Sequence, residues 1–237
     1  MLVTGGTRGI GLAIARRLVR DGAGRVVLGY LRNDDAAEAA ATEIRAAGAE
    51  VDLVRGNVAS ASTVEKIGAA GPYRVVVHNA ATGVIRPALE ADDKHWDWTL
   101  NANARSLLAI ARATVPAMET GSAIVAISSL GAQRVLDNYV LVGTSKAALE
   151  SVVRYLGVEL APRGVRVNAV SAGVVETEAL DWFPNKDEML ATVDRTPAGR
   201  LVEPADVAAA VSFLCSGDSA MVCGQTLIVD GGFSLKA

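Results

Sequence analysis

The chain has 237 residues, which is enough for one large α/β domain with a well-buried core. Its formal net charge of -3 gives no reason to expect binding to nucleic acid, and we find no apolar run long enough to cross a membrane. Hydrophobic residues make up 51% of the chain, as is typical of a protein whose strands are covered by helices on both faces. No signal peptide precedes the first motif, so we expect a cytoplasmic protein.

The cysteines and histidines do not form a pattern that would hold a metal ion. Cys215 and Cys223 lack CxxC spacing and have no neighbouring histidine, so we interpret them as idle thiols. His78 and His95 lie far apart and have no partner acids in a ligand pattern. We therefore predict no metal site and no catalytic triad.

Short apolar runs alternate with amphipathic stretches along the chain. We predict strands at residues 1–4, 25–30, 51–54, 74–78, 122–128, 165–170 and 226–229. We predict helices near residues 9–22, 34–47, 61–70, 92–118, 137–161 and 204–215. This alternation indicates an α/β fold of the Rossmann type, with a doubly wound parallel sheet of about seven strands and helices on both faces. No repeat or linker divides the chain, so we expect a single domain over residues 1–237.

One long irregular stretch, at residues 171–203, interrupts this alternation of strands and helices. It contains Trp182, Phe183 and Pro184, followed by a short helix predicted from Lys186. Long loops inside compact domains are usually functional. We predict that this stretch is a substrate-binding loop; the alternative is a surface excursion without a function.

A glycine-rich turn, TGGTRGIG at residues 4–11, follows the first strand and opens a helix. Glycines at such a junction permit a tight turn and close approach of the backbone to an anion, while the amides at the helix start point toward it. This context predicts a dinucleotide-binding site, and the chain would then be an NAD(P)-binding domain. The residues assigned to the phosphate cradle are Gly5, Thr7, Arg8, Gly9, Ile10 and Gly11.

The end of the second strand indicates which dinucleotide binds. An acid at this point favours NAD, whereas a cation favours the 2′-phosphate of NADP. Here the strand is followed by Arg32 and Asn33, the first acid is Asp34, and Arg8 adds a positive charge in the glycine-rich turn. We therefore predict NADP(H) as cofactor; the alternative is that Arg32 is a solvated surface cation.

Further segments fit one family. They are NAA at 79–81, Asn103, the serine pair at 128–129, Lys146, NAVSAG at 168–173 after the sixth strand, and GQTLIVDGG at 224–232. With the glycine-rich turn, they resemble the short-chain dehydrogenase/reductase family over essentially the whole chain. The resemblance implies a seven-stranded doubly wound fold that binds NAD(P). It also implies a catalytic set of Asn, Ser, Tyr and Lys, with the tyrosine four residues before the lysine.

Three members of that set match this chain and the fourth is displaced. Asn103, Ser129 and Lys146 stand at the family positions, whereas Val142 occupies the position of the tyrosine. Tyr139 supplies a phenol three residues earlier. Within the helix predicted at 137–161, positions 139, 142 and 146 share one face, and the phenol moves by roughly 4.5 Å along the axis.

The wide spacing between Tyr139 and Lys146 resembles that of enoyl-acyl-carrier-protein reductases of bacterial fatty-acid synthesis. Three local strings resemble the NADPH-using branch whose sequence stays close to ketoacyl reductases: HWDWTLNAN at 95–103, SSLG at 128–131 and TPAGR at 196–200. By this resemblance Tyr139 would donate a hydrogen bond to the enolate oxygen, and Lys146 would hold the nicotinamide ribose. We also interpret Trp182 and Phe183 as residues that close over an acyl chain; the alternative is an oligomer contact or an exposed loop.

The resemblance also assigns supporting residues. Ser129 would be less central than in other family members, and Asn103 would support the helix backbone and an ordered water. Family members commonly form tetramers through the helices predicted at 92–118 and 137–161 and the last strand, so we expect a homotetramer. The remaining residues expected in the cofactor site are Asn57, Val58, Asn79, Ala80, Gly173, Val175 and Thr177.

Three functions remain open from the sequence. The first is NADPH-dependent reduction of the carbon–carbon double bond of an enoyl thioester, carried on acyl carrier protein or coenzyme A. The second is an NADPH-dependent carbonyl reductase for a 3-oxoacyl or polyketide-type substrate, and Val142 argues against it. The third is a non-catalytic NADP-binding sensor protein, and the pair of Tyr139 and Lys146 argues against it.

Overall fold

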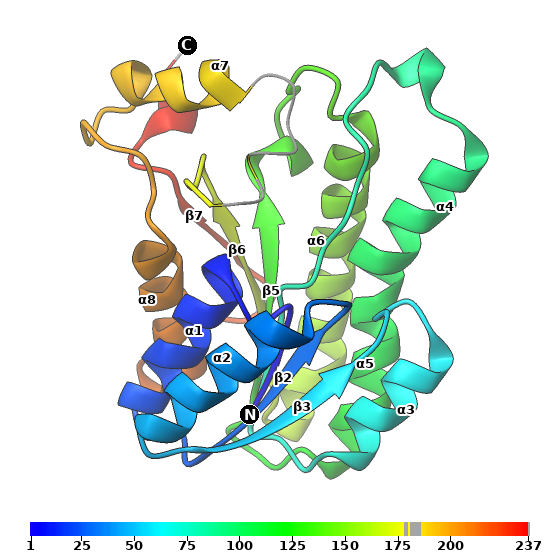
Figure 1. Ribbon diagram of the computed structural model, residues 1–237, viewed down its shortest axis with the longest axis vertical. Coiled ribbons are helices and arrows are strands. Elements are labelled where there is room, and N and C mark those ends of the chain that lie inside the picture. The colour runs from blue at the N-terminus through cyan, green and yellow to red at the C-terminus, as the bar shows by residue number, and fades with distance from the viewer. Residues whose placement is uncertain (178–179, 181–185, 237) are drawn as a thin grey trace.

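The computed structural model describes residues 1–177, 180 and 186–236. Within these residues, seven strands form one parallel sheet in the order β3-β2-β1-β4-β5-β6-β7 (Figure 1). The strands are β1 (Leu2–Thr4), β2 (Arg25–Tyr30), β3 (Glu50–Arg55), β4 (Val75–His78), β5 (Ala123–Ser129), β6 (Arg166–Ala172) and β7 (Thr226–Val229). The α-helices are α1 (Gly9–Arg20), α2 (Asp34–Ala46), α3 (Ala61–Ala69), α4 (Asp93–Leu100), α5 (Ser106–Thr114), α6 (Val140–Leu160), α7 (Lys186–Leu190) and α8 (Pro204–Cys215).

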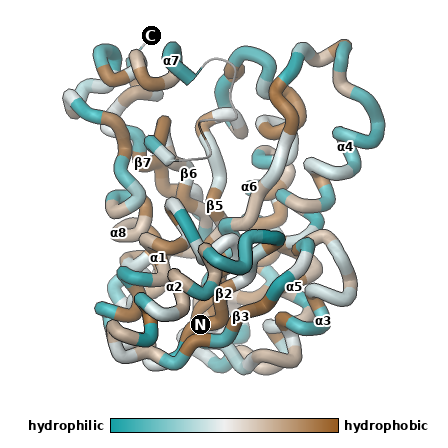
Figure 2. Tube along the Cα trace, in the orientation of Figure 1, coloured by the Kyte–Doolittle hydropathy of each residue, from teal (hydrophilic) through white to brown (hydrophobic). Residues whose placement is uncertain are grey.

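Helices cover both faces of the sheet, and each face has its own apolar core. On one face, α1, α2 and α8 pack on the strands through residues such as Ile14, Ile44 and Val211. On the other face, α3, α5 and α6 do so through residues such as Ile110 and Leu149. Figure 1 shows these two layers, and Figure 2 shows hydrophobic colouring along strands such as β2. The predicted α/β fold class is therefore confirmed.

The order in which the chain adds strands to the sheet reverses beside β1: β2 and β3 lie on one side of it, and β4 to β7 lie on the other. Strand β1 pairs in parallel with β2 on one side and with β4 on the other. Because all neighbouring strands are parallel, their carboxyl ends lie at the same edge of the sheet. In open α/β sheets, ligands bind beyond that edge, at the point where the strand order reverses.

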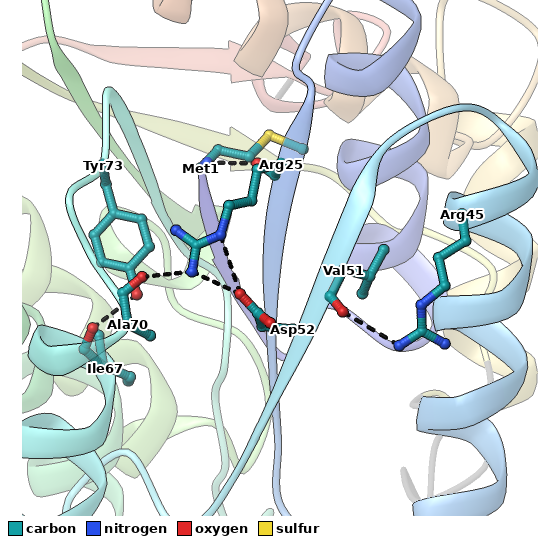
Figure 3. Close-up of polar contacts among 8 residues, drawn as sticks. All are labelled: Met1, Arg25, Arg45, Val51, Asp52, Ile67, Ala70 and Tyr73. Atoms are coloured by element: carbon teal, nitrogen blue, oxygen red, sulfur yellow. Dashed lines mark hydrogen bonds and ion pairs between the residues drawn. The ribbon is translucent and has the colours of Figure 1, made fainter.

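Polar contacts connect the segments at the amino ends of the strands, on the side of the sheet opposite the carboxyl ends (Figure 3). The amino group of Met1 donates to the carbonyl of Arg25 at 2.8 Å. The guanidinium of Arg25 pairs with Asp52 at 2.6 Å, and so links β2 to β3. The hydroxyl of Tyr73 donates to the carbonyl of Ile67 at 2.7 Å, and burial raises the pKa of this phenol to about 12.

The helix predicted near residues 92–118 is present as one helical run from Asp93 to Ala117, but the type of helix changes along it. Helix α4 is followed by a π-helical turn at Asn101–Arg105, then by α5 and a 3₁₀ turn at Val115–Ala117. A π turn widens the helix by one residue and often marks a functional position. Here Asn103 lies inside the turn, and its side chain bonds to the backbone of Thr82 instead of facing solvent.

The helix predicted at 137–161 begins three residues later than expected. Asn138 adopts a left-handed conformation with φ of 58°, which a helix cannot contain but asparagine tolerates. Helix α6 therefore starts at Val140, and Tyr139 is its N-cap residue. The expectation that Tyr139 lies within the helix was wrong, although the Tyr139 carbonyl accepts the first helical bond, from Gly143 at 2.7 Å.

The predicted irregular stretch at 171–203 is shorter than expected. Strand β6 runs to Ala172, so Asn168 lies within the strand and not after it. The amide of Asn168 bonds to the backbone of Val222 and Gln225, which explains a buried asparagine there. The short helix predicted from Lys186 is present as α7. Trp182, Phe183 and Pro184 lie outside the described residues.

Candidate active site

The glycine-rich turn lies between β1 and α1 at the carboxyl edge of the sheet. Gly5 and Gly9 adopt left-handed φ values of 62° and 51°, which favour glycine. A Cβ atom at Gly11 would collide with the carbonyl oxygen of Gly5, so the turn can close only around glycine. The first turn of α1 carries no acid, and Arg8 precedes it as N-cap. The turn, which also contains Thr7 and Ile10, thus presents a helix start suited to a phosphate group.

The end of β4 is tied to this turn. The side-chain amide of Asn79 donates to the carbonyls of Thr4 and Gly5, each at 3.0 Å. The hydroxyl of Thr4 in turn accepts from the backbone N–H groups of Asn79 and Ala80, each at 3.0 Å. These bonds hold the β1 and β4 ends together where the strand order reverses. Asn79 and Ala80 therefore lie beside the glycine-rich turn.

The turn after β2 lies at the same edge. Arg32 is exposed there, and Asn33 caps α2 by accepting from the N–H of Ala36. The acid that follows, Asp34, accepts from the hydroxyl of Tyr30 at 2.8 Å and from Arg55 at 3.0 Å. Both oxygens of this carboxylate are thus engaged by the protein, while Arg32, two residues earlier, is exposed.

Four of the remaining predicted cofactor residues follow two other strands. Asn57 and Val58 come after β3, where the side chain of Asn57 accepts from the N–H of Ala59. Val175 comes after β6, is buried, and pairs with Val202 in an isolated bridge. Thr177 lies across from the cradle, because a Cβ atom at Gly9 would stand 3.6 Å from its methyl group.

Gly173 also follows β6, where it lets two backbone segments meet. Its N–H donates to the carbonyl of Val229, and a Cβ atom in its place would lie 3.0 Å from Asp230. Gly173 therefore joins the end of β6 to the end of β7 at the predicted cofactor edge.

Tyr139 and Ser129 come together at the end of β5. The two hydroxyl oxygens lie 3.3 Å apart, and the Ser129 hydroxyl also accepts from the N–H of Gly131 at 3.3 Å. The side chain of Tyr139 is largely withdrawn from solvent, and this burial raises the pKa of its phenol, while the bond from Ser129 acts in the opposite direction. The phenol therefore stays protonated at neutral pH and is able to donate a hydrogen bond.

Two glycines that we did not predict form a slot for the ring of Tyr139. A Cβ atom at Gly131 would lie 2.5 Å from two ring carbons of Tyr139, and one at Gly143 would lie 2.7 Å from the carbonyl oxygen of Gly131. Val142 is buried, and a Cβ atom at Gly83 would collide with it. The SSLG string contains Gly131, but nothing in the sequence indicates which ring packs on it.

Lys146 lies on α6 one turn after Val142, and its side chain is buried. Its ammonium donates to the carbonyl of Ile127 on β5 at 2.7 Å. Burial lowers the pKa of Lys146 to about 8, although the nearby carboxylate of Glu150 favours the charged form. An ammonium with this pKa is charged at neutral pH and loses its charge in mildly alkaline solution.

Asn103 connects three segments around the site. Its side-chain carbonyl accepts from the N–H of Thr82 at 2.8 Å, and its amide donates to the carbonyl of Thr82 and to the hydroxyl of Ser145, each at 2.8 Å. Asn103 is fully buried in this network. It thus fixes the segment after β4 against α6, immediately before Lys146, whereas Asn101 bonds to Arg105 at the surface.

A groove with a volume of about 440 Å³ opens beside Tyr139. It lies between the segment before α4, including Pro87 and Ala88, and the segment before α6, including Arg134 and Asn138. Within the described residues, no cluster of His, Cys, Asp and Glu could hold a metal ion, and no helix is long and apolar enough to cross a membrane.

Comparisons with known proteins agree with this geometry. A family model described as Enoyl-(Acyl carrier protein) reductase matches residues 5–234. The 1-cyclohexenylcarbonyl-CoA reductase of Streptomyces collinus is 36% identical, over 100% of this chain and 87% of that protein. The D-erythrulose reductase of Gallus gallus is 32% identical, over 98% of this chain and 94% of that protein.

A solved structure shows the same fold. It is a short-chain dehydrogenase from Burkholderia cenocepacia in complex with NADP, which superimposes with a TM-score of 0.91. The two proteins are 32% identical, and the alignment covers 98% of this chain and 96% of the other. From the match to the family model and the full-length relatives, the chain belongs to the short-chain dehydrogenase/reductase family.

Proposed function

We propose that this protein uses NADPH to reduce the carbon–carbon double bond of an enoyl thioester, carried on acyl carrier protein or coenzyme A. The observation that carries the proposal is the pairing of Tyr139 with Ser129 while Val142, at the usual tyrosine position, is buried without a hydroxyl. The likeness to 1-cyclohexenylcarbonyl-CoA reductase, which is named for an acyl-CoA substrate, supports the same chemistry.

The residues at the cradle fit NADP(H). The glycine-rich turn offers backbone amides to a diphosphate, and Arg8 and Arg32 favour the additional 2′-phosphate. The structurally similar short-chain dehydrogenase from Burkholderia cenocepacia is in complex with NADP. When bound, NADPH supplies the hydride that is added to the β-carbon of the substrate.

The chain itself stabilises the charge that develops on the substrate. Hydride addition to the β-carbon places negative charge on the thioester oxygen, and Tyr139 donates a hydrogen bond to that oxygen as the charge builds. Its raised pKa keeps the proton on the phenol. Lys146 holds the nicotinamide ribose and adds a positive charge nearby, while Asn103 keeps the segment after β4 in place.

A carbonyl substrate is the second candidate. The likeness to D-erythrulose reductase, which is named for a carbonyl compound, favours it. Reduction of a carbonyl requires a proton on the reacting oxygen, which the family takes from a tyrosine at the position of Val142. The displaced phenol favours the enoyl substrate. A sensor without catalysis would need neither Tyr139 nor a buried ammonium.

We also propose a homotetramer. On α6, Tyr155 is 70% exposed and Val158 is 76% exposed, and on the edge strand β7 Leu227 and Ile228 are 38% and 43% exposed. A single chain would leave this apolar surface in water, and the family buries it between subunits. The molar mass in solution, measured by light scattering, should be four times that of the chain; a monomer at micromolar concentration would contradict the proposal.

The substrate is tested by following the absorbance of NADPH in two parallel reactions. One contains a crotonyl thioester and the other an acetoacetyl thioester. We expect oxidation of NADPH with the crotonyl thioester and little with the acetoacetyl thioester. The opposite result would make the protein a carbonyl reductase, and binding of NADPH without oxidation in either reaction would support the sensor.

A further inference from the structure

Glu150 is a buried acid to which the proposed reaction assigns no role. It lies on α6 one turn after Lys146 and is 3% exposed. Burial of a carboxylate carries a large desolvation cost unless its oxygens accept strong hydrogen bonds. Both oxygens of Glu150 do accept such bonds, and both bonds come from the strand-end segment that carries Ser129.

The two bonds flank one turn. Oε1 of Glu150 accepts from the hydroxyl of Ser128 at 2.6 Å, and Oε2 accepts from the amide of Gln133 at 3.0 Å. Ser128 lies immediately before the turn formed by residues 129–132, and Gln133 lies immediately after it. One buried carboxylate thus holds both ends of the turn that positions Ser129 and supports the ring of Tyr139.

The charge of Glu150 also acts on Lys146. Within the described residues no acid forms an ion pair with Lys146, and its ammonium instead donates to the carbonyl of Ile127. At longer range, the carboxylate of Glu150 favours the charged lysine against the effect of burial.

Other groups near Lys146 do not replace this charge. His78, at the end of β4, interacts electrostatically with Lys146, but burial lowers the pKa of the imidazole to about 3, so it is neutral. Strand β5 and the turn after it, which pack against this part of α6, contain no ionisable side chain. On β6, Arg166 is committed to the carbonyl of Leu214 and to Ser219, and in the π turn Arg105 is exposed.

We propose that Glu150 is a positioning residue for the active site. Its carboxylate fixes the turn that aligns Ser129 and Tyr139, and it places a negative charge one helical turn from Lys146. The inference rests on the proposed roles of Tyr139 and Lys146, but it holds for either an enoyl or a carbonyl substrate.

The test compares Glu150→Gln and Glu150→Leu with Glu159→Gln, a control at an exposed acid on the same helix. The glutamine keeps the shape but removes the charge, whereas the leucine removes both hydrogen bonds as well. Two quantities are measured for each protein: kcat with whichever thioester the unchanged protein reduces, and the dissociation constant of NADPH between pH 6 and 9.5.

For Glu150→Gln we expect NADPH affinity to be nearly normal at pH 6. The pH at which this affinity falls should be lower than in the unchanged protein by about one unit, because the lysine loses its anionic neighbour. In Glu150→Leu, kcat should fall on the order of tenfold or more, the effect of losing charge-assisted hydrogen bonds. The values for Glu159→Gln should equal those of the unchanged protein.

Equal pH profiles for Glu150→Gln and the unchanged protein would overturn the inference, as would normal kcat in Glu150→Leu. Because NADPH affinity requires no turnover, this part of the test remains decisive if no thioester is reduced. In that case the proposed enoyl chemistry fails, and a shifted pH profile still supports the role of Glu150 toward Lys146.

Discussion

At the scale of single residues, the phenol of Tyr139 takes its position from glycines and from Ser129. The ring lies on Gly131, and its hydroxyl lies 3.3 Å from that of Ser129. The sequence was sufficient to single out Tyr139, Ser129 and Lys146, because they match a family pattern. The glycine slot was not predictable, since a glycine in a sequence does not indicate which side chain fills the space beside it.

We expect Gly131→Ala to displace the ring of Tyr139. The added methyl group would lie 2.5 Å from two ring carbons, so the ring must move. On the proposed function, kcat should fall on the order of tenfold to a hundredfold, while the dissociation constant of NADPH changes little. The control is Gly217→Ala, where an added methyl group meets no atom within 4 Å. Normal kcat in Gly131→Ala would show that the slot is not needed.

The pH dependence of the reaction should follow Lys146. The pKa of about 8 means that the free protein loses the ammonium charge as the pH rises through 8, whereas Tyr139 keeps its proton there. We therefore expect kcat/KM for NADPH to decline above pH 8. In Lys146→Arg, which is always charged, the overall value should be lower but this decline should disappear. A decline that persists unchanged in Lys146→Arg would assign it to another group.

At the scale of elements, the strands and most helices were predictable, and the differences have local causes. Helix α8 and strands β2 and β7 have the predicted bounds. Helix α6 starts late because Asn138 is left-handed, and the helix predicted near 92–118 widens into a π turn where Asn103 bonds to Thr82. Both causes are contacts or backbone states that periodicity in the sequence does not reveal.

The junction of β2 and α2 should set the choice of cofactor. Arg32 is exposed at this junction, while the carboxylate of Asp34 is held by Tyr30 and Arg55. On the proposed preference for NADP(H), Arg32→Glu should weaken the binding of NADPH on the order of tenfold to a hundredfold and leave NADH binding nearly unchanged. Fluorescence titration with both nucleotides measures this. Equal effects on NADPH and NADH would mean that Arg32 does not contact the 2′-phosphate.

At the scale of the whole molecule, the parallel sheet brings segments far apart in the sequence to one edge. The fold class was predictable because apolar runs alternate with amphipathic stretches throughout the chain. The network around Glu150 and the burial of His78 were not, because both depend on the packing of distant elements. The same burial makes His78 a source of acid sensitivity for the folded protein.

We expect His78 to destabilise the fold at low pH. Its pKa is about 3 in the folded protein, because burial and the charge of Lys146 disfavour the imidazolium, and about 6.5 in the unfolded chain. Between these values the unfolded chain binds one more proton, so stability falls as the pH falls below 6.5. Between pH 7.5 and 5, the free energy of unfolding should therefore fall by about 2 kcal/mol more than in His78→Gln. Urea unfolding at both pH values measures this, and equal losses would disprove it.

The central claim is that the displaced phenol of Tyr139 carries the chemistry, and Tyr139→Phe tests it most directly. The measurement is kcat with a crotonyl thioester, together with the dissociation constant of NADPH for the same protein. Phenylalanine keeps the ring in its slot but removes the donor, so kcat should fall on the order of a hundredfold or more while NADPH affinity stays within about twofold. Turnover close to that of the unchanged protein would remove Tyr139 from the mechanism.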